Sequence, residues 1–245
     1  MTPRLALAAA LLGAVLASPA RAEDGPGVPS TGSFEVRVGN YRPKIDAQAG
    51  LTGSPGPYQA DFGSGRPTIF WAHGAKALPW HAAGTLELGL GVGYWSAKGH
   101  ALFEVSGLPS SDRTTFSVVP TELTATWRLD LLWERLSIPL VPYARASLQR
   151  YNWWVAGASG ATTKSGATNG YGYGGGLALV LDFLDPMLAR EQQADSGVKH
   201  TMLTVDLQKT KIDDFGSSSG KSPTRSWDLS DTKKTDLTFG LLFVF

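Results

Sequence analysis

Apolar residues recur at every second position along much of this chain, and this alternation constrains its fold more than any other feature. From 237 onward, every odd position of the segment 235–245 is leucine or phenylalanine, whereas Asp236, Thr238 and Gly240 lie between them. Successive side chains of a β-strand point to opposite faces, so the segment predicts a strand with one apolar face.

The same alternation recurs upstream and predicts eight strands, with ten as an alternative. Phe116 and Val118 lie on the opposite parity from Leu123, so we expect a β-bulge near Pro120 that resets the register. The expected strands cover residues 33–41, 67–73, 85–95, 116–133, 141–151, 171–183, 198–209 and 235–245.

The positions between the apolar residues hold mostly small side chains. Of the 245 residues 29 are glycine and only 18% are charged, against about 25% charged residues in ordinary soluble domains. Small inward side chains suit a narrow closed barrel, and an apolar outer face with aromatic residues near the strand ends suits lipid. Because backbone groups in hydrocarbon need partners, such strands must close. We therefore predict an all-β fold, a closed up-and-down antiparallel transmembrane β-barrel.

Composition excludes several other classes. The formal net charge of +1 argues against a dedicated nucleic-acid binder. The chain has no cysteine, which excludes disulfide frameworks, thiol catalysis and thiolate zinc sites. It has no apolar run of about 18 residues, so a transmembrane helix is not predicted.

The N-terminal segment has the features of a secretory signal peptide. Arg4 precedes an apolar and small-residue run, and Ala20 and Ala22 give a small-x-small cleavage pattern with Glu23 as the expected first mature residue. The alternative is a short helix packed on the core. We expect a signal peptide at 1–22, a flexible leader at 23–31 and a single barrel domain at 32–245.

The connections between the expected strands alternate in length. Segments 46–66, 97–113, 155–169 and 210–234 are long and polar, as expected for outer loops. Segments 74–82 and 133–141 are shorter, and 184–197 should hold a short helix near 185–195 between Pro186 and Gly197. An even strand number then places both ends of the mature chain on the periplasmic side.

The mature chain resembles small OmpA-type outer-membrane β-barrels, particularly a myxobacterial family without an assigned activity. The resemblance is carried by YRPKID at 41–46, GLGVGYW at 89–95, IPLVPY at 138–143, LDFLD at 181–185 and the final FVF. It implies location in the cell outer membrane. It also implies that the barrel-assembly machinery recognises the last strand through Phe239, Leu241, Phe243 and Phe245.

Residues suited to catalysis or metal binding are few. None of the four histidines, His73, His81, His100 and His200, lies at metal-ligand spacing from another. We expect His200 to point inward beside Asp206 as a hydrogen-bond partner. No catalytic, cofactor-binding or metal-binding residue is predicted, and no cofactor.

Charged residues fall on the parity expected to face the lumen. Buried charges must be paired, so we expect a network of Glu35, Arg37, Glu87, Glu122, Arg128, Arg145 and Asp206, with Asp130 and Asp182 on the same parity.

These residues predict an outer-membrane barrel with a plugged lumen and a structural or surface-interaction role. Its expected partners are outer-membrane lipid, lipopolysaccharide and the assembly machinery, with no nucleic acid. The alternatives are a lipid A-modifying enzyme, a small channel, or a secreted lipocalin-like binder with a polar exterior.

Overall fold

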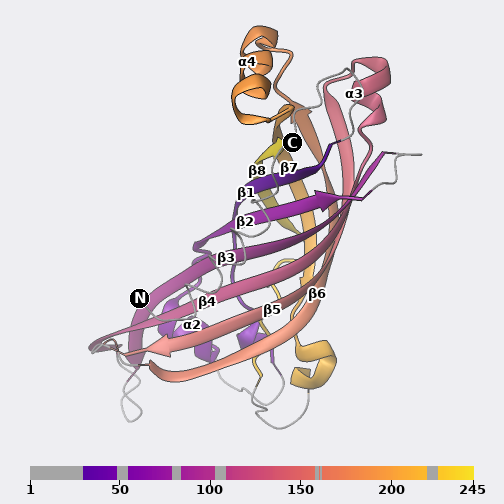
Figure 1. The fold of residues 1–245 in the computed structure, drawn as a ribbon. Coiled ribbons are helices and arrows are strands. Elements are labelled where there is room, and N and C mark those ends of the chain that lie inside the picture. Colours follow the sequence, from indigo (N-terminus) through magenta and orange to yellow (C-terminus); the bar gives the residue numbers. More distant parts are fainter. Residues whose placement is uncertain are drawn as a thin grey trace.

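Eight antiparallel strands form a closed barrel in which each strand pairs with its neighbours in sequence and β1 pairs with β8 (Figure 1). The computed structural model describes residues 30–48, 55–78, 84–102, 109–157, 160, 162–219 and 226–245. The strands are β1 (Gly32–Asn40), β2 (Thr68–Ala77), β3 (Thr85–Leu102), β4 (Pro109–Arg128), β5 (Leu140–Ala156), β6 (Thr162–Val180), β7 (His200–Lys211) and β8 (Asp236–Val244). The predicted eight-stranded barrel is confirmed, and the proposed cleavage site at Ala20, Ala22 and Glu23 lies outside the described residues.

Short helices lie at both ends of the barrel. They are η1 (Ile45–Ala47), α2 (Pro57–Phe62), α3 (Leu131–Leu136), α4 (Pro186–Ser196) and η2 (Asp214–Ser219). The predicted helix is α4, which begins where the Asp185 carboxylate accepts hydrogen bonds from two backbone N–H groups and ends at Gly197 with φ 72°. No helix in the described ranges has the length and hydropathy needed to cross a membrane.

The two ends of the barrel differ in what they carry. Helices α3 and α4 lie at the end where β8 finishes, which we call the α4 end, and α2 lies at the opposite end, the α2 end (Figure 1). At the α4 end the Thr31 N–H donates to the Phe245 carbonyl and the Phe245 N–H donates to the Gly32 carbonyl, at 2.6 and 2.9 Å. The first and last described segments of the chain therefore meet there.

Two expected connections are wrong because strands extend into them from both sides. Strands β3 to β6 have 17–20 residues, whereas β1, β2, β7 and β8 have 9–12. Segments 97–113 and 155–169 are therefore largely strand, and β3 to β6 extend past the rest of the wall at the α2 end (Figure 1). At the α4 end β4 stops at Arg128 rather than continuing to Trp133, which lies in α3.

The expected β-bulge near Pro120 is also wrong. Residues on both sides of Pro120 keep one register with β3, from Val92 opposite Thr121 to Trp95 opposite Val118, and the two intervening pairs are missing from the ladder. Proline has no N–H to donate, so the ladder opens locally without a shift. Gly93 makes room for the ring, because a Cβ there would lie 2.8 Å from the Pro120 Cγ.

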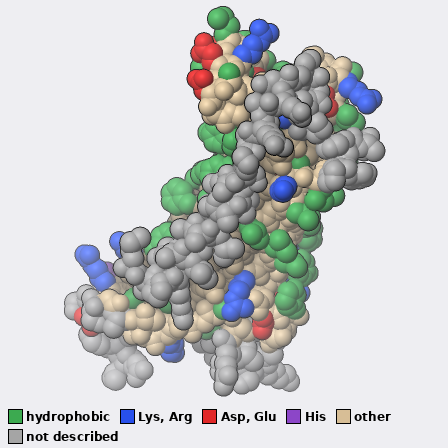
Figure 2. Space-filling model, in the orientation of Figure 1, with side chains coloured by type: hydrophobic (Ala, Val, Ile, Leu, Met, Phe, Trp, Pro, Cys, Tyr) green, Lys and Arg blue, Asp and Glu red, His purple; other side chains and the backbone are tan. Residues whose placement is uncertain are grey.

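The outer wall carries a belt of exposed apolar side chains. Figure 2 shows such side chains across the middle of the visible face, with most charged groups toward the two ends. We call this set the apolar belt: Val36, Val38, Phe70, Leu88, Leu90, Tyr94, Leu123, Trp127, Leu148, Tyr171, Tyr173, Leu177, Leu203, Val205, Leu207, Leu237, Phe239 and Leu241.

A polar row borders the belt toward the α2 end. Thr121, Arg150 and Asn169 face one another across β4, β5 and β6, one pair beyond the row of Leu123, Leu148 and Tyr171. The Arg150 guanidinium donates to the Asn169 side-chain oxygen at 3.2 Å, and the Thr121 hydroxyl donates to the Arg150 carbonyl at 3.2 Å. The outer face of the wall thus changes from apolar side chains to hydrogen-bonded polar side chains between two successive outward-facing positions.

Candidate functional site

The interior of the barrel has three layers. Along β5 the inward side chains change from Val141 and Tyr143 at the α4 end, through a polar middle, to Tyr151 and Trp153 at the α2 end. The α4-end layer is apolar and consists of Val141, Tyr143, Ala178, Val180, Met202, Leu242 and Val244, with Trp133 packed against it. The middle layer holds charged residues, and the α2-end layer is aromatic.

Two arginines and three carboxylates form the larger ion-pair cluster of the middle layer. Arg37 lies 2.5 Å from Glu122 and 3.6 Å from Glu35, and it approaches Asp206 at 3.8 Å. Arg145 lies 2.6 Å from Glu35 and 3.6 Å from Asp206. All five residues are buried. Both arginines share Glu35 and Asp206, so this cluster ties β1, β4, β5 and β7 together across the lumen.

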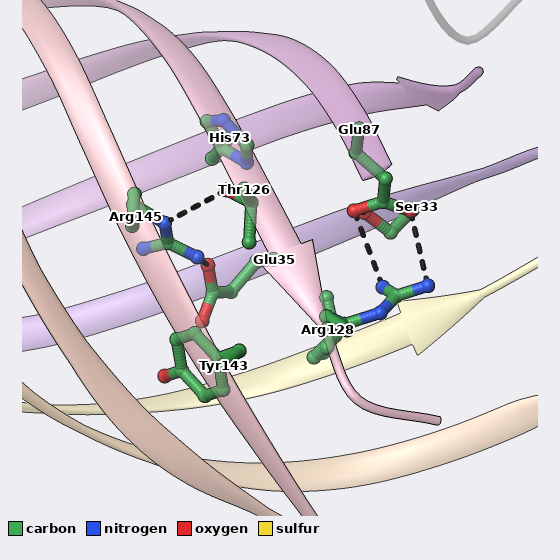
Figure 3. A pocket seen from close by; sticks show the side chains of 9 residues that line it. Ser33, Glu35, His73, Glu87, Thr126, Arg128, Tyr143 and Arg145 are labelled. Carbon is green, nitrogen blue, oxygen red and sulfur yellow. Dashed lines mark hydrogen bonds and ion pairs between the residues drawn. The ribbon is translucent and has the colours of Figure 1, made fainter. Parts of the chain in front are cut away.

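A second cluster lies nearer the α4 end. The Arg128 guanidinium is 3.1 Å from the Glu87 carboxylate and 3.4 Å from Asp130, which follows the end of β4. The Ser33 hydroxyl donates to Glu87 at 2.8 Å. Figure 3 shows Glu87, Ser33 and Arg128 together, apart from Glu35, Arg145 and Thr126. The seven expected lumen residues thus occupy two clusters rather than one.

Neutral polar side chains complete the middle layer, and their individual roles were not predicted. The Thr204 hydroxyl donates to Glu35, the Gln149 amide to Glu122 and the Arg145 Nε to Thr126, at 2.9–3.3 Å. His73 Nε2 lies 2.6 Å from the Thr124 hydroxyl. These neutral side chains all lie at inward-facing positions of their strands, and that pattern could have identified them from the sequence.

Little empty space remains among these side chains. The cavity lined by Ser33, Glu35, His73, Glu87, Thr126, Arg128, Tyr143, Arg145 and Leu242 has a volume of about 10 Å³ (Figure 3). That is roughly the room one water molecule needs. The middle layer is therefore filled by side chains.

The α2-end layer is a buried aromatic cluster that the sequence did not predict as inward-facing. Trp95 and Phe116 are fully buried with ring centroids 5.5 Å apart, and Trp153 stacks on Trp227 at 4.1 Å with a 9° interplanar angle. We call the whole set the aromatic cap: Tyr41, Ile45, Tyr58, Ile69, Trp71, Trp95, Ala97, Phe116, Val118, Tyr151, Trp153, Ile212 and Leu229, with Phe62, Val155 and Trp227 against it.

Helix α2 and segment 226–231 supply the part of the cap that lies across the mouth. Tyr58 of α2 is buried against Phe116, and the Tyr41 hydroxyl donates to the Leu229 carbonyl at 2.5 Å. Burial raises the pKa of Tyr41 well above its ordinary value and that of Tyr58 to about 12. Both hydroxyls are therefore harder to ionise than that of a solvent-exposed tyrosine, and the Tyr41 hydroxyl serves as a donor to Leu229.

The expectation for His200 is wrong in its partner. His200 Nδ1 lies 2.6 Å from the Asp182 carboxylate, not beside Asp206, and its ring packs edge-on against Trp133. This pair lies at the α4 end, next to a pocket of about 40 Å³. Asp182 also accepts from the Thr201 N–H at 3.1 Å, so it fixes the start of β7.

The residues of the last strand that we expect to guide assembly share the outer face. Phe239 and Leu241 are exposed in the apolar belt, whereas Leu242 and Val244 point into the lumen. Phe243 and Phe245 are on the same parity as Phe239 and are half-buried. No group of three or more His, Asp or Glu side chains able to hold a metal occurs in the described ranges.

No protein-family model matches the chain, and no curated protein matches it. Several solved structures share its architecture. The N-terminal β-barrel domain of Pseudomonas aeruginosa OprF is 12% identical with a TM-score of 0.39, and Ail, the attachment invasion locus protein of Yersinia pestis, is 11% identical with a TM-score of 0.42. Each match covers 89% of this chain and 100% of the other.

A major outer membrane protein from Thermus thermophilus is 13% identical with a TM-score of 0.37, covering 87% of this chain and 99% of its own. At these identities and scores, the location and role of the barrel have to be argued from its own residues.

Proposed function

We propose that the chain is an integral outer-membrane β-barrel protein whose lumen is sealed, and that it has a structural or surface-interaction role. The observation that carries the proposal is the inversion of chemistry across the wall at mid-height. There the outer face is the apolar belt and the inner face holds buried ion pairs. A water-soluble barrel would have the opposite arrangement.

The dimensions of the belt support membrane insertion. On β3 the outward-facing positions from the half-buried Leu86 through the belt residues Leu88, Leu90 and Tyr94 span a length that fits the roughly 9–11 residues a tilted strand needs to cross a bilayer. Tyr94, Tyr171 and Tyr173 lie toward the α2 end and Trp127 toward the α4 end, as in an aromatic girdle. We place the α4 end in the periplasm, because barrels with an even strand number keep both termini there.

The layered interior supports a sealed lumen rather than a channel. A permeating ion would have to pass the apolar α4-end layer, break the Arg37–Glu122 and Arg145–Glu35 pairs, and then cross the aromatic cap. Eight strands leave an interior that side chains can fill. The same sealing separates His73 and Thr124 from any substrate, which disfavours a catalytic role for this pair.

The surface-interaction part of the role is supported by the tall side of the barrel. Strands β3 to β6 project beyond the belt at the α2 end, where the cap lies against their inner face and the outer face begins with the polar row of Thr121, Arg150 and Asn169. A rigid sheet raised above the membrane presents a fixed surface to molecules outside the cell.

Export and assembly complete the proposal. Cleavage between Ala22 and Glu23 would release the mature chain, and the outward residues Phe239, Leu241, Phe243 and Phe245 would be recognised by the barrel-assembly machinery. The expected partners are the membrane lipid and lipopolysaccharide. Membership of the myxobacterial family is proposed on the sequence resemblance alone.

Electrophoretic mobility and conductance test the proposal together. The barrel refolded in lipid vesicles should migrate differently before and after boiling and should resist extraction by high salt. Planar bilayers containing it should show no stepwise conductance. Extraction by salt would refute membrane insertion, whereas regular conductance steps would refute only the sealed lumen. Altered acylation of lipopolysaccharide on overexpression would favour the enzyme alternative.

A further inference from the structure

The rim of the wall between β5 and β7 carries aromatic and cationic side chains at the edge of the apolar belt. Tyr171 pairs with Leu148 on one side and Lys211 on the other, and Tyr173 pairs with Lys209. Arg150 lies one row further toward the α2 end, opposite Asn169. Both tyrosines, both lysines and Arg150 are exposed on the outer face.

Two of the three cations are uncompensated. Lys211 pairs with Asp213 at 3.3 Å. Arg150 donates only to the neutral side chains of Asn152 and Asn169, and neither it nor Lys209 has a carboxylate within ion-pair distance in the described part of the chain. A lipid-facing wall with two unpaired cations at its edge attracts anions at headgroup depth.

A strained turn adds a third aromatic residue at the same rim. Asp214 and Phe215, at the start of η2, both have left-handed backbone conformations with φ of 55° and 56°. Such backbone conformations are strained for residues other than glycine. Asp214 is held in place by a 3.0 Å hydrogen bond from Asn169, the partner of Arg150. Phe215 is 62% exposed.

We propose that this rim patch, made of Arg150, Tyr171, Tyr173, Lys209, Lys211 and Phe215, binds the phosphorylated headgroup of an outer-leaflet glycolipid. The cations would bind the phosphate, the tyrosines would lie between the acyl chains and the sugar, and Phe215, which follows the polar row of Arg150 and Asn169, would lie beside the headgroup. The inference rests on the proposed membrane orientation, which places this rim at the outer leaflet.

Continuity with the belt favours a lipid over a soluble protein partner. Tyr173 and Leu207 lie on neighbouring strands of the same wall, so the patch has no boundary that separates it from the lipid-facing surface. A membrane lipid contacts the belt and the rim simultaneously. Aromatic rings beside cations at the edge of an apolar wall match the chemistry of a lipid with an anionic head.

The absence of cysteine allows a clean test. The F215C variant is labelled with an environment-sensitive nitrobenzoxadiazole probe and refolded in phosphatidylcholine vesicles with or without diphosphoryl lipid A. We expect the probe to shift to shorter wavelength and to be quenched by lipids brominated near the headgroup when lipid A is present. A probe that stays in water in both vesicles would overturn the proposal.

Charge variants test the phosphate. The double variant R150Q/K209Q should bind fluorescent lipid A about thirtyfold more weakly, because each cation near the surface contributes on the order of a factor of five. The matched control R135Q/R190Q removes two cations at the α4 end and should leave affinity unchanged. Equal binding of dephosphorylated lipid A, or equal loss in both double variants, would refute the site.

A second substitution separates binding from folding. F215G relieves the left-handed strain, so the barrel should fold at least as well as the parent while lipid A retention falls severalfold. If the labelled barrel fails to insert at all, the membrane proposal is wrong. If it inserts without preferring lipid A, only the rim patch is wrong.

Discussion

The middle of the lumen and its α2 end are equally well buried, yet their chemistry is opposite. Glu35 and Trp95 are both inaccessible to solvent, but the first belongs to an ion-pair cluster and the second to the aromatic cap. The difference follows from what lies outside the wall. At mid-height the outer face is apolar and the inner face polar, whereas beyond the belt the outer face begins with the polar row of Thr121, Arg150 and Asn169 and the inner face is apolar.

The long strands β3, β4 and β5 therefore each carry outward apolar residues in the belt and inward apolar residues in the cap. On β4, Leu123 points outward in the belt, and Phe116 and Val118 point inward in the cap. The strand keeps its register while its apolar parity reverses. Under the proposed membrane insertion, the reversal marks the height at which the surroundings change from lipid to water.

Breaking the middle layer should have the largest effect. Replacing Arg37 with Met leaves Glu122 without its arginine and weakens the pairing of Glu35 and Asp206, and removing one partner of a buried pair costs about 3–5 kcal/mol. We expect that loss in the free energy of unfolding, measured by urea titration in vesicles. R150M, which changes an exposed arginine, should alter stability by less than about 0.5 kcal/mol.

The matching double variant sharpens this prediction. R37M/E122M should recover part of the lost stability, because replacing both members of a buried pair with apolar residues is often close to neutral. Equal destabilisation in the single and double variants would show that side-chain packing, and not ion pairing, stabilises the middle layer.

Breaking the cap should have a smaller, more local effect. Leu229 is fully buried where segment 226–231 closes the mouth, and Leu→Ala at such a site costs about 3 kcal/mol. We expect L229A to accelerate protease cleavage at the α2 end while the barrel keeps its mobility on gels. L188A on α4, which is exposed at the other end, serves as the control.

The smallest effect tests how closely the backbones of β6 and β7 approach each other at Gly174. A Cβ at Gly174 would overlap the Leu207 carbonyl oxygen, so G174A should cost about 1–3 kcal/mol through overpacking. Gly65 has open space around its Cα, and G65A should be close to neutral. Equal tolerance of the two substitutions would mean that the glycines on β6 are not needed for packing.

The strands of the barrel were predictable where one environment extends along a whole strand. The alternation on β8, from Leu237 to Phe243, gives the strand and its outward face correctly because its leucine and phenylalanine residues of this parity stay on the outer face along the full length of the strand. On β4 the same reasoning misplaced Phe116, because periodicity reports which residues share a face and not which side of the wall that face is on. A bulge was then assumed to explain a reversal caused by the change of surroundings.

The sequence predicted which charged residues face the lumen, but not which of them form ion pairs with one another. Inward parity identified the charged residues, since desolvated charges in a narrow barrel need partners. It could not show that Arg128 pairs with Glu87 and stays outside the cluster of Arg37 and Arg145, because ion pairing depends on the stagger between strands. Nor could it place α2 and segment 226–231 across the mouth, since those contacts join residues as distant as Tyr41 and Leu229.

The closure of the barrel between β1 and β8 has a consequence for how the protein folds. Phe34 pairs with Phe243, so this ladder joins nearly opposite ends of the described chain. Contacts this far apart carry a high loop-closure entropy and slow folding. The other seven ladders join strands that are neighbours in sequence and can form one after another. The β1–β8 ladder should therefore form last. Until it forms, the open edges of β1 and β8 need protection from pairing with other chains.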